Sequence, residues 1–212
     1  MVQLKTKKIT TACSHCRRIG DKLFLKGEKC MTAKCPFAKR SYAPGQHGPT
    51  QKHVKVSGYG KQLREKQKVK YMYGILEKQF SNYVTEASSK PGDTSKYLLT
   101  YLESRLDNAV FRAGIAKSRS AARQYVVHGL IAVDGEKVDR PSFRVKVGNV
   151  IGISEKGKKR KTFTDLSEKL VKVETPSWLA LDTKANTAKV LNTPAPQEVN
   201  FNAKAIIEFY SR

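Results

Sequence analysis

The stretch between Leu102 and Ile153 constrains the fold more than any other, because its apolar residues change from helical to strand spacing along it. Its first part predicts one helix that ends at Gly114 and a second that runs from an N-cap at Ser118 to Gly129. The expected buried stripes are Leu102, Leu106, Ala109, Val110 and Ala113 in the first helix, and Ala122, Tyr125 and Val126 in the second. Two short helices thus lead into strands within one compact module.

The second part of this stretch has the pattern of a β-hairpin. Asp134-Gly135-Glu136 separates Ile131–Val133 from Lys137-Val138, and Gly135 supplies the positive φ that a tight turn demands. Further strands are predicted over Phe143–Val147 and Val150–Ile153, with Gly148-Asn149 between them. The module is therefore expected to be an ααβ-hairpin unit with a return strand.

Basic residues are expected on the outer faces of the two helices. Ser118 stands at a helix start, where free N–H groups can bind a phosphate, and Lys117 and Arg119 flank it. The other outward cations are Arg105 and Arg112 on the first helix and Arg123, one turn beyond Arg119, on the second. This pattern predicts an RNA-binding module, and the alternative is an ordinary domain with a solvated basic face.

Net charge extends this interpretation to the whole chain. The 212 residues include 41 Lys and Arg against 18 Asp and Glu, which gives +23 at pH 7, far beyond what solubility needs. A polyanion is the simplest partner for such a charge. No apolar run approaches the roughly 20 residues needed to span a bilayer, and MVQLKTKKITTAC lacks a signal-peptide core, so a cytoplasmic location without membrane binding is expected.

Four cysteines in the first forty residues form two close pairs, Cys13-x2-Cys16 and Cys30-x4-Cys35. Two such pairs separated by a loop suit a closed tetrahedral zinc site, which is structural rather than catalytic. Two disulfides are an alternative that a reducing cytoplasm disfavours, and an iron–sulfur cluster uses the same ligands. His15, inside the first pair, is expected to be exposed.

A basic connector follows from Arg40 to Lys70, with eight Lys or Arg against the single acid Glu65. Ser41–Pro49 combines a rigid turn with Tyr42, Gln46 and His47, a set that suits an irregular RNA surface, although an ordinary mobile loop has the same composition. Gln62–Lys70 predicts a highly charged helix with too few apolar residues to be a core element by itself, and backbone phosphates would be its natural partners.

Core periodicity returns in the remaining segments. Ile75–Ala87 predicts a helix with Leu76, Phe80, Tyr83, Val84 and Ala87 inward, and a new helix is expected to begin at Asp93, Thr94 or Ser95. Trp178–Leu181 and Ala188–Leu191 predict strands, with Trp178 in a packing role. Pro194-Ala195-Pro196 breaks regular structure, and the apolar stretch Ala205–Tyr210 is expected to return to the first domain.

These segments carry a resemblance to a known family. The motifs are the four-cysteine knuckle, YAPGQHG, LREKQK before YGILEKQF, LESRLDNAVFRAG and the ending IEFYSR, in that order. Together they resemble bacterial-type small-subunit ribosomal protein four, and residues 102–151 resemble the small RNA-binding module named after it. The segment from about Glu155 to Asn202 matches only loosely.

The resemblance implies a primary binder of small-subunit ribosomal RNA that attaches in the 5′ domain and nucleates assembly of the subunit body. It also implies a role in decoding accuracy beside small-subunit proteins five and twelve, near the messenger RNA entry channel. The expected fold is α+β, and the protein is not expected to form a homo-oligomer. Its expected parts are a mostly helical zinc-knuckle domain (1–97), the RNA-binding module (98–160) and a short β-rich segment that docks back on the core (161–212).

The sequence thus nominates two sets of residues. The zinc ligands are Cys13, Cys16, Cys30 and Cys35. The RNA-binding candidates are Arg17, Arg18, Arg40, Tyr42, Gln46, His47, Lys61, Arg64, Lys66, Lys68, Lys70, Arg105, Arg112, Lys117, Ser118, Arg119, Arg123 and His128. An RNA-modifying enzyme would need a nucleotide-binding loop or an acid–base constellation, and a DNA-binding regulator would need a recognition helix after the knuckle; the sequence offers neither, so no enzyme is expected.

Overall fold

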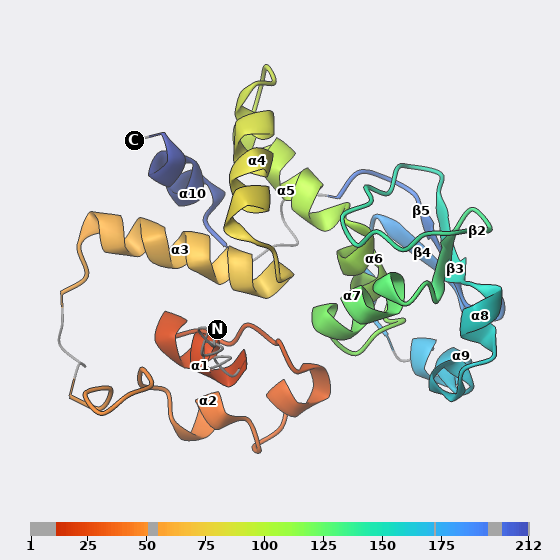
Figure 1. Ribbon diagram of the computed structural model, residues 1–212, viewed down its shortest axis with the longest axis horizontal. Coiled ribbons are helices and arrows are strands. Elements are labelled where there is room, and N and C mark those ends of the chain that lie inside the picture. The colour runs from red at the N-terminus through yellow and green to blue at the C-terminus, as the bar shows by residue number, and fades with distance from the viewer. Residues whose placement is uncertain (1–11, 51–54, 172, 195–200, 212) are drawn as a thin grey trace, which may run out of the picture.

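The computed structural model describes residues 12–50, 55–171, 173–194 and 201–211, and these form two hydrophobic cores joined side by side. One core belongs to a group of helices, and the other lies between two short helices and a five-stranded sheet (Figure 1). The structure is therefore of the α+β class, as expected.

The N-terminal segment holds short helices and loops. It contains α1 (Ala12–Ile19), the 3-10 turn η1 (Gly27–Cys30) and α2 (Pro36–Lys39). His15 is not freely exposed, because its ring stacks on that of Tyr71 with centroids 3.9 Å apart. This stacking ties α1 to α3 (Gly58–Tyr73), which contains Tyr71.

The helical core is built from α3 (Gly58–Tyr73), α4 (Glu77–Ser88), α5 (Thr94–Glu103) and α10 (Ala203–Tyr210). Ser57 and Asp93 cap α3 and α5 by accepting hydrogen bonds from the backbone N–H groups of Gly60 and Ser95. Phe80, Tyr83, Val84 and Ala87 are buried as predicted, but Leu76 is 77% exposed because it precedes α4 instead of lying on its inner face.

α10 packs against α3, α4 and α5, so this late segment does return to the N-terminal helices (Figure 1). Ile206 of α10 is fully buried in the helical core. α3 contributes only Val69 and Tyr73 to the buried residues of this core, which agrees with the expectation that Gln62–Lys70 has too few apolar residues to form a core by itself. The exposed residues of this helix lie in its first half: Gly58, Tyr59, Lys61 and Arg64.

The module consists of α6 (Leu106–Arg112), α7 (Arg119–Val127) and strands β1 (Ile131–Val133), β2 (Glu136–Lys137) and β3 (Val150–Ile153). The hairpin turn is confirmed, with positive φ at both Asp134 and Gly135. The expected strand over Phe143–Val147 is wrong, since only an isolated bridge between Arg144 and Arg105 forms there.

The first predicted helix of the module is also broken in two. Ser104 ends α5, Arg105 is extended at φ −63° and ψ 139°, and α6 begins at Leu106. All five residues of the predicted apolar stripe are buried, but Leu102 lies in the helical core while the other four lie in the module core. The break therefore marks the junction of the two cores.

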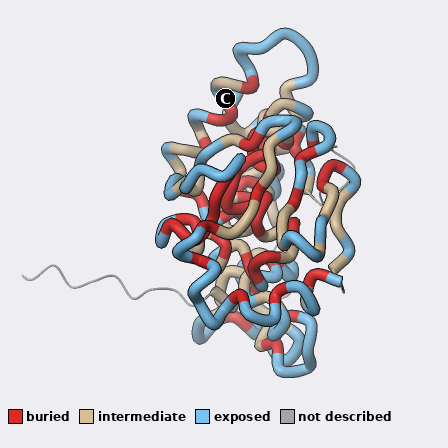
Figure 2. The backbone as a smooth tube through the Cα atoms, turned by 90° about the vertical axis from the view of Figure 1, so that its right-hand side faces the viewer, coloured by how far each residue is buried: buried red, intermediate tan, exposed pale blue. Residues whose placement is uncertain are grey.

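The chain after the module completes its sheet. α8 (Glu155–Lys158), the 3-10 turn η3 (Lys161–Phe163) and α9 (Leu166–Leu170) lead to β4 (Leu179–Asp182) and β5 (Thr187–Val190). The sheet is antiparallel throughout, in the order β2-β1-β3-β5-β4. Trp178 is 1% exposed in this core, which confirms its packing role, and Figure 2 shows the buried backbone at the centre with exposed loops around it.

Candidate nucleic-acid interface

The four cysteines are free thiols; Cys16, Cys30 and Cys35 are buried and Cys13 is half-buried. Burial raises the pKa of Cys16, and the thiolates of Cys30, Cys13 and Cys35 lie close enough to raise it further. The donor set has the chemistry of a structural zinc site. Even so, among the residues that the structure describes, no three His, Cys, Asp or Glu side chains are arranged around a common metal position.

The YAPGQHG loop is held against α1 by Arg17. Its Nε donates to the backbone carbonyl of Tyr42 at 3.0 Å, and its guanidinium lies 5.0 Å from the centre of the Tyr42 ring. Arg17 and Tyr42 therefore pack against each other, and both side chains are only partly exposed. The exposed candidates in this region are Arg18, Arg40, Gln46 and His47.

The lysines of α3 do not all face solvent. Lys66 and Lys70 both bind Glu77, at 2.6 and 2.9 Å, and Lys68 binds Asp21 at 2.8 Å. Lys66 and Lys68 are buried and already paired with acids, so they are less available to phosphates than Lys61 and Arg64, and their RNA-binding role stays a prediction. Lys61 and Arg64, on the outer face of the same helix, are exposed and remain candidates.

Glu77 is the centre of the junction between α3, α4 and α10. Its carboxylate also accepts a hydrogen bond from the Tyr210 hydroxyl at 2.7 Å. Burial alone would raise its pKa, but the hydrogen bonds from Lys66, Lys70 and Tyr210 lower the pKa to about 2. Lys66 and Lys70 of α3 are thus held by Glu77 of α4, and this pairing joins the two helices.

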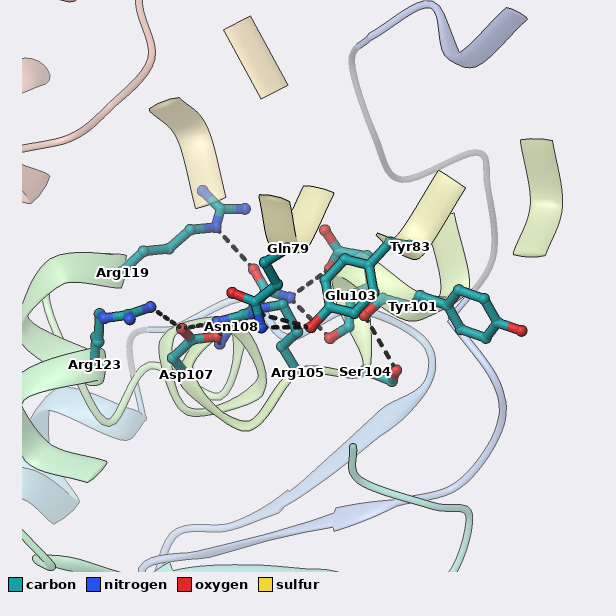
Figure 3. Close-up of polar contacts among 10 residues, drawn as sticks. All are labelled: Gln79, Tyr83, Tyr101, Glu103, Ser104, Arg105, Asp107, Asn108, Arg119 and Arg123. Carbon is teal, nitrogen blue, oxygen red and sulfur yellow. Dashed lines mark hydrogen bonds and ion pairs between the residues drawn. The ribbon is translucent and has the colours of Figure 1, made fainter. Parts of the chain in front are cut away.

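Arg105 is fully buried, so its prediction as an exposed RNA contact was wrong. Its guanidinium forms a two-pronged pair with Asp107, at 3.0 and 2.6 Å, and donates to the Tyr83 hydroxyl at 2.9 Å (Figure 3). The extended backbone at Arg105 turns its side chain inward. A continuous helix, as predicted from the sequence, would place this side chain on the outer face. Arg105 therefore links the module to α4.

Glu103 forms a second buried cluster beside the first. Its carboxylate accepts hydrogen bonds from Tyr73, from Asn108 at 2.9 Å and from Arg112 at 3.0 Å. Burial alone would raise the pKa of Glu103, but the charges of Arg112 and Arg119 hold it below its ordinary value. Arg112, whose side chain is 24% exposed, is mainly a structural partner here.

Arg119 is also less available than predicted. Its Nε donates to the side-chain oxygen of Asn108 at 2.8 Å (Figure 3). Its guanidinium lies 4.8 Å from the centre of the Tyr73 ring and 4.6 Å from that of the Phe111 ring. This desolvation lowers its pKa. Replacing Arg119 would therefore disturb the joint between the cores as well as any RNA contact.

The start of α7 presents other cations to solvent. Ser118 is buried and its Oγ accepts from Ala121, so this cap occupies one of the N–H groups expected to be free. Arg123 is 43% exposed and its contact with Asp107 is long, at 3.4 Å. Lys117 is exposed and pairs with Glu28 at 2.9 Å, and His128 is exposed. Arg123 and Lys117 are thus the accessible cations near the start of α7, whereas His128 is exposed at its C-terminal end.

The residues that join the cores were not predicted from the sequence: Tyr73, Glu103 and Asn108 in one cluster, and the Arg144–Glu86 pair at 2.6 Å in another. Arg144 also lies 4.2 Å from the Tyr101 ring. The signal was present in LESRLDN, where two acids alternate with arginine. Acids in so basic a chain were a sign of internal ion pairs.

We expect Asp107→Ala to lower the free energy of unfolding by about 3 to 5 kcal/mol, because it leaves the Arg105 guanidinium buried without its counter-charge. Glu155→Ala is the matched control, since it breaks the solvent-exposed pair with Lys158 and should leave stability unchanged. Urea unfolding at pH 7 measures both. Equal effects of the two substitutions would contradict the structural role of Arg105.

No helix within the described ranges is long and apolar enough to cross a membrane. Exposed cations occur instead on all parts of the chain: Arg18 and Arg40 near the knuckle, Arg64 on α3, Lys117 in the module and Lys161 beyond it. A compact helix–helix–hairpin module with such a surface defines the class of the molecule, an RNA-binding protein.

Comparison with known families identifies that class more closely. Residues 7–103 match the ribosomal protein S4/S9 N-terminal domain, and residues 104–151 match the S4 domain. The chain belongs to the family of small ribosomal subunit protein uS4. The boundary between the two matches falls at the break between α5 and α6.

Relatives match over nearly the whole chain. Small ribosomal subunit protein uS4 of Clostridioides difficile is 49% identical over 203 residues, which is 95% of this chain and 97% of that protein. The uS4 proteins of Acetivibrio thermocellus and a Thermoanaerobacter species are each 48% identical, over 95% and 94% of this chain and 97% and 96% of theirs. Membership of this ribosomal-protein family agrees with the expectation that the protein is not an enzyme.

Proposed function

We propose that the protein is a structural constituent of the small ribosomal subunit and binds small-subunit ribosomal RNA, in the cytoplasm where ribosomes work. The observation that carries this is the near full-length similarity to small ribosomal subunit proteins. The net charge of +23 and the exposed cations on both halves of the molecule fit an RNA partner.

The family resemblance supports a more specific role. The protein is a primary binder in the 5′ domain of this RNA, nucleates assembly of the subunit body and contributes to translational accuracy. Its neighbours would be small-subunit proteins five and twelve and the messenger RNA near the entry channel. A rigid joint between the two cores suits such a role, because it fixes the relative positions of cations on both halves.

The chemistry of the knuckle supports one structural zinc ion, held by Cys13, Cys16, Cys30 and Cys35. The four free thiols lie close enough for their charges to affect one another, and three of them are buried. Burial alone would raise the pKa of Cys35, but the backbone N–H groups of Ala38 and Phe37 and the charge of Lys22 lower it, which favours the thiolate that binds metal. Zinc would tie η1 to α1 and carry no reaction.

The proposed function is tested by asking whether RNA or duplex DNA retains the protein. The full chain is mixed with a transcript of the small-subunit 5′ domain and an equal mass of duplex DNA, and we expect it to be retained on the RNA and to co-sediment with small subunits. Preference for duplex DNA would favour a DNA-binding regulator. Retention on neither polymer at low salt would overturn the proposal altogether.

A further inference from the structure

A cleft of about 940 Å³ lies where the knuckle, the module and the segment after the module meet. Its lining comes from Glu28 in η1, from α6 and α7, from Lys161 and Leu166, and from residues 173–177. Figure 1 shows α6 and α7 between the N-terminal segment and α9. The sequence did not predict this cleft.

Two close approaches occur beside residues that line this cleft. A Cβ on Gly27 would lie 2.1 Å from the backbone oxygen of Lys117, so only glycine lets the knuckle loop meet the module there. A Cβ on Gly114 would lie 2.7 Å from both methyl carbons of Val173. The cleft is therefore a defined feature of the folded chain rather than a gap between loose parts.

The floor of the cleft is apolar and partly aromatic. Phe111, Ile115, Tyr125, Leu166 and Pro176 line it. The Tyr125 ring packs edge-on against Phe163, with centroids 5.1 Å apart, which fixes its orientation. An apolar floor with an aromatic ring suits a flat, uncharged group such as a nucleobase.

The rim carries charges of both signs. Lys117 is paired with Glu28, but both side chains are largely exposed, at 63% and 74%, so a phosphate can compete for the lysine. Lys161 and Glu174 are exposed on the rim as well, while the charge of Arg112 is already taken by Glu103. The carboxylates of Glu28 and Glu174 disfavour several phosphates in a row, but they can accept hydrogen bonds from the amino group of a base.

We propose that this cleft receives one unstacked nucleotide of the RNA, with its base on the floor beside Tyr125 and its phosphate at Lys117 or Lys161. The inference rests on the proposed function and locates within it a site for a single nucleotide. It predicts recognition of an unpaired position, which the scattered exposed cations do not provide.

Blocking the cleft tests this. Thr162 is exposed and lines the cleft, so Thr162→Trp fills it from the rim; Thr164→Trp, exposed but outside the lining, is the matched control. We expect Thr162→Trp to weaken binding to the 5′ domain transcript about 5- to 150-fold at fixed salt, the loss of one stacked base. Chemical probing of base edges should show one unpaired nucleotide that wild type and Thr164→Trp protect and Thr162→Trp leaves reactive.

The outcomes separate this inference from the proposed function. If wild type binds the transcript while both tryptophan variants bind it equally well and protect the same bases, the cleft holds no nucleotide and the inference is overturned. If wild type itself is not retained on the RNA, both proposals fail. Circular dichroism and the thermal midpoint confirm that each variant is folded.

Discussion

Raising the salt concentration from about 50 to about 200 mM is expected to lower the affinity for small-subunit ribosomal RNA by roughly three to five orders of magnitude, if about 6 to 10 phosphates are contacted. Each cation that binds a phosphate releases condensed counterions, and added salt opposes that release. Exposed cations near the knuckle, on α3 and in the module make many simultaneous contacts possible. Titrations with labelled transcript at several salt concentrations give the slope.

α3 supplies a matched pair of variants for this titration. Arg64→Ala removes an exposed cation and should reduce the slope by about one phosphate contact, whereas Lys66→Ala removes a buried lysine already bound to Glu77 and should leave the slope unchanged. An affinity almost independent of salt would rule out extensive phosphate binding. An equal change in slope for both variants would show that burial of Lys66 does not decide its role.

Removal of zinc by a chelator is expected to unfold the knuckle. Structural zinc in small domains contributes apparent binding free energies of about 10 to 16 kcal/mol, and α1, η1 and α2 are short elements with only a few buried side chains. Metal analysis should find one zinc per chain, and hydrogen exchange should show loss of protection over residues 12–40 after chelation.

The module serves as an internal control for the chelation experiment, because its core is built from residues 106–190 and should keep its protection. Cys30→Ser should reproduce the effect of the chelator in the knuckle without any added reagent. Iron in the purified protein, or absorption of visible light, would indicate an iron–sulfur cluster instead of zinc. Unchanged exchange in residues 12–40 would show that the knuckle needs no metal.

Local signals in the sequence predicted most of the secondary structure. Ser118 caps α7, Asp93 caps α5, and the turn at Asp134-Gly135 joins β1 to β2, because each depends on a few neighbouring residues. Family motifs located the module in the same way. The predicted strand over Phe143–Val147 does not form. This segment makes only an isolated bridge, between Arg144 and Arg105, and lies in a loop.

The candidate site was harder to predict, since a cation looks the same in sequence whether it faces solvent or an acid. Arg105 and Lys66 were expected outside, yet one binds Asp107 and the other Glu77. Glu77 is sequentially distant from Tyr210, and Glu86 is distant from Arg144, so no local pattern reports these contacts. Only packing of the two cores decides which cations remain for RNA.

The position of α10 has a consequence for the order of events during synthesis. Domains usually form in the order in which they leave the ribosome. Among the residues that the structure describes, the sheet core includes none beyond Val190, whereas the helical core, whose earlier members emerge first, lacks Ile206 until α10 appears. During synthesis the sheet core can therefore be completed before the helical core. Until α10 emerges, the helices of the first half expose the apolar face that Ile206 covers.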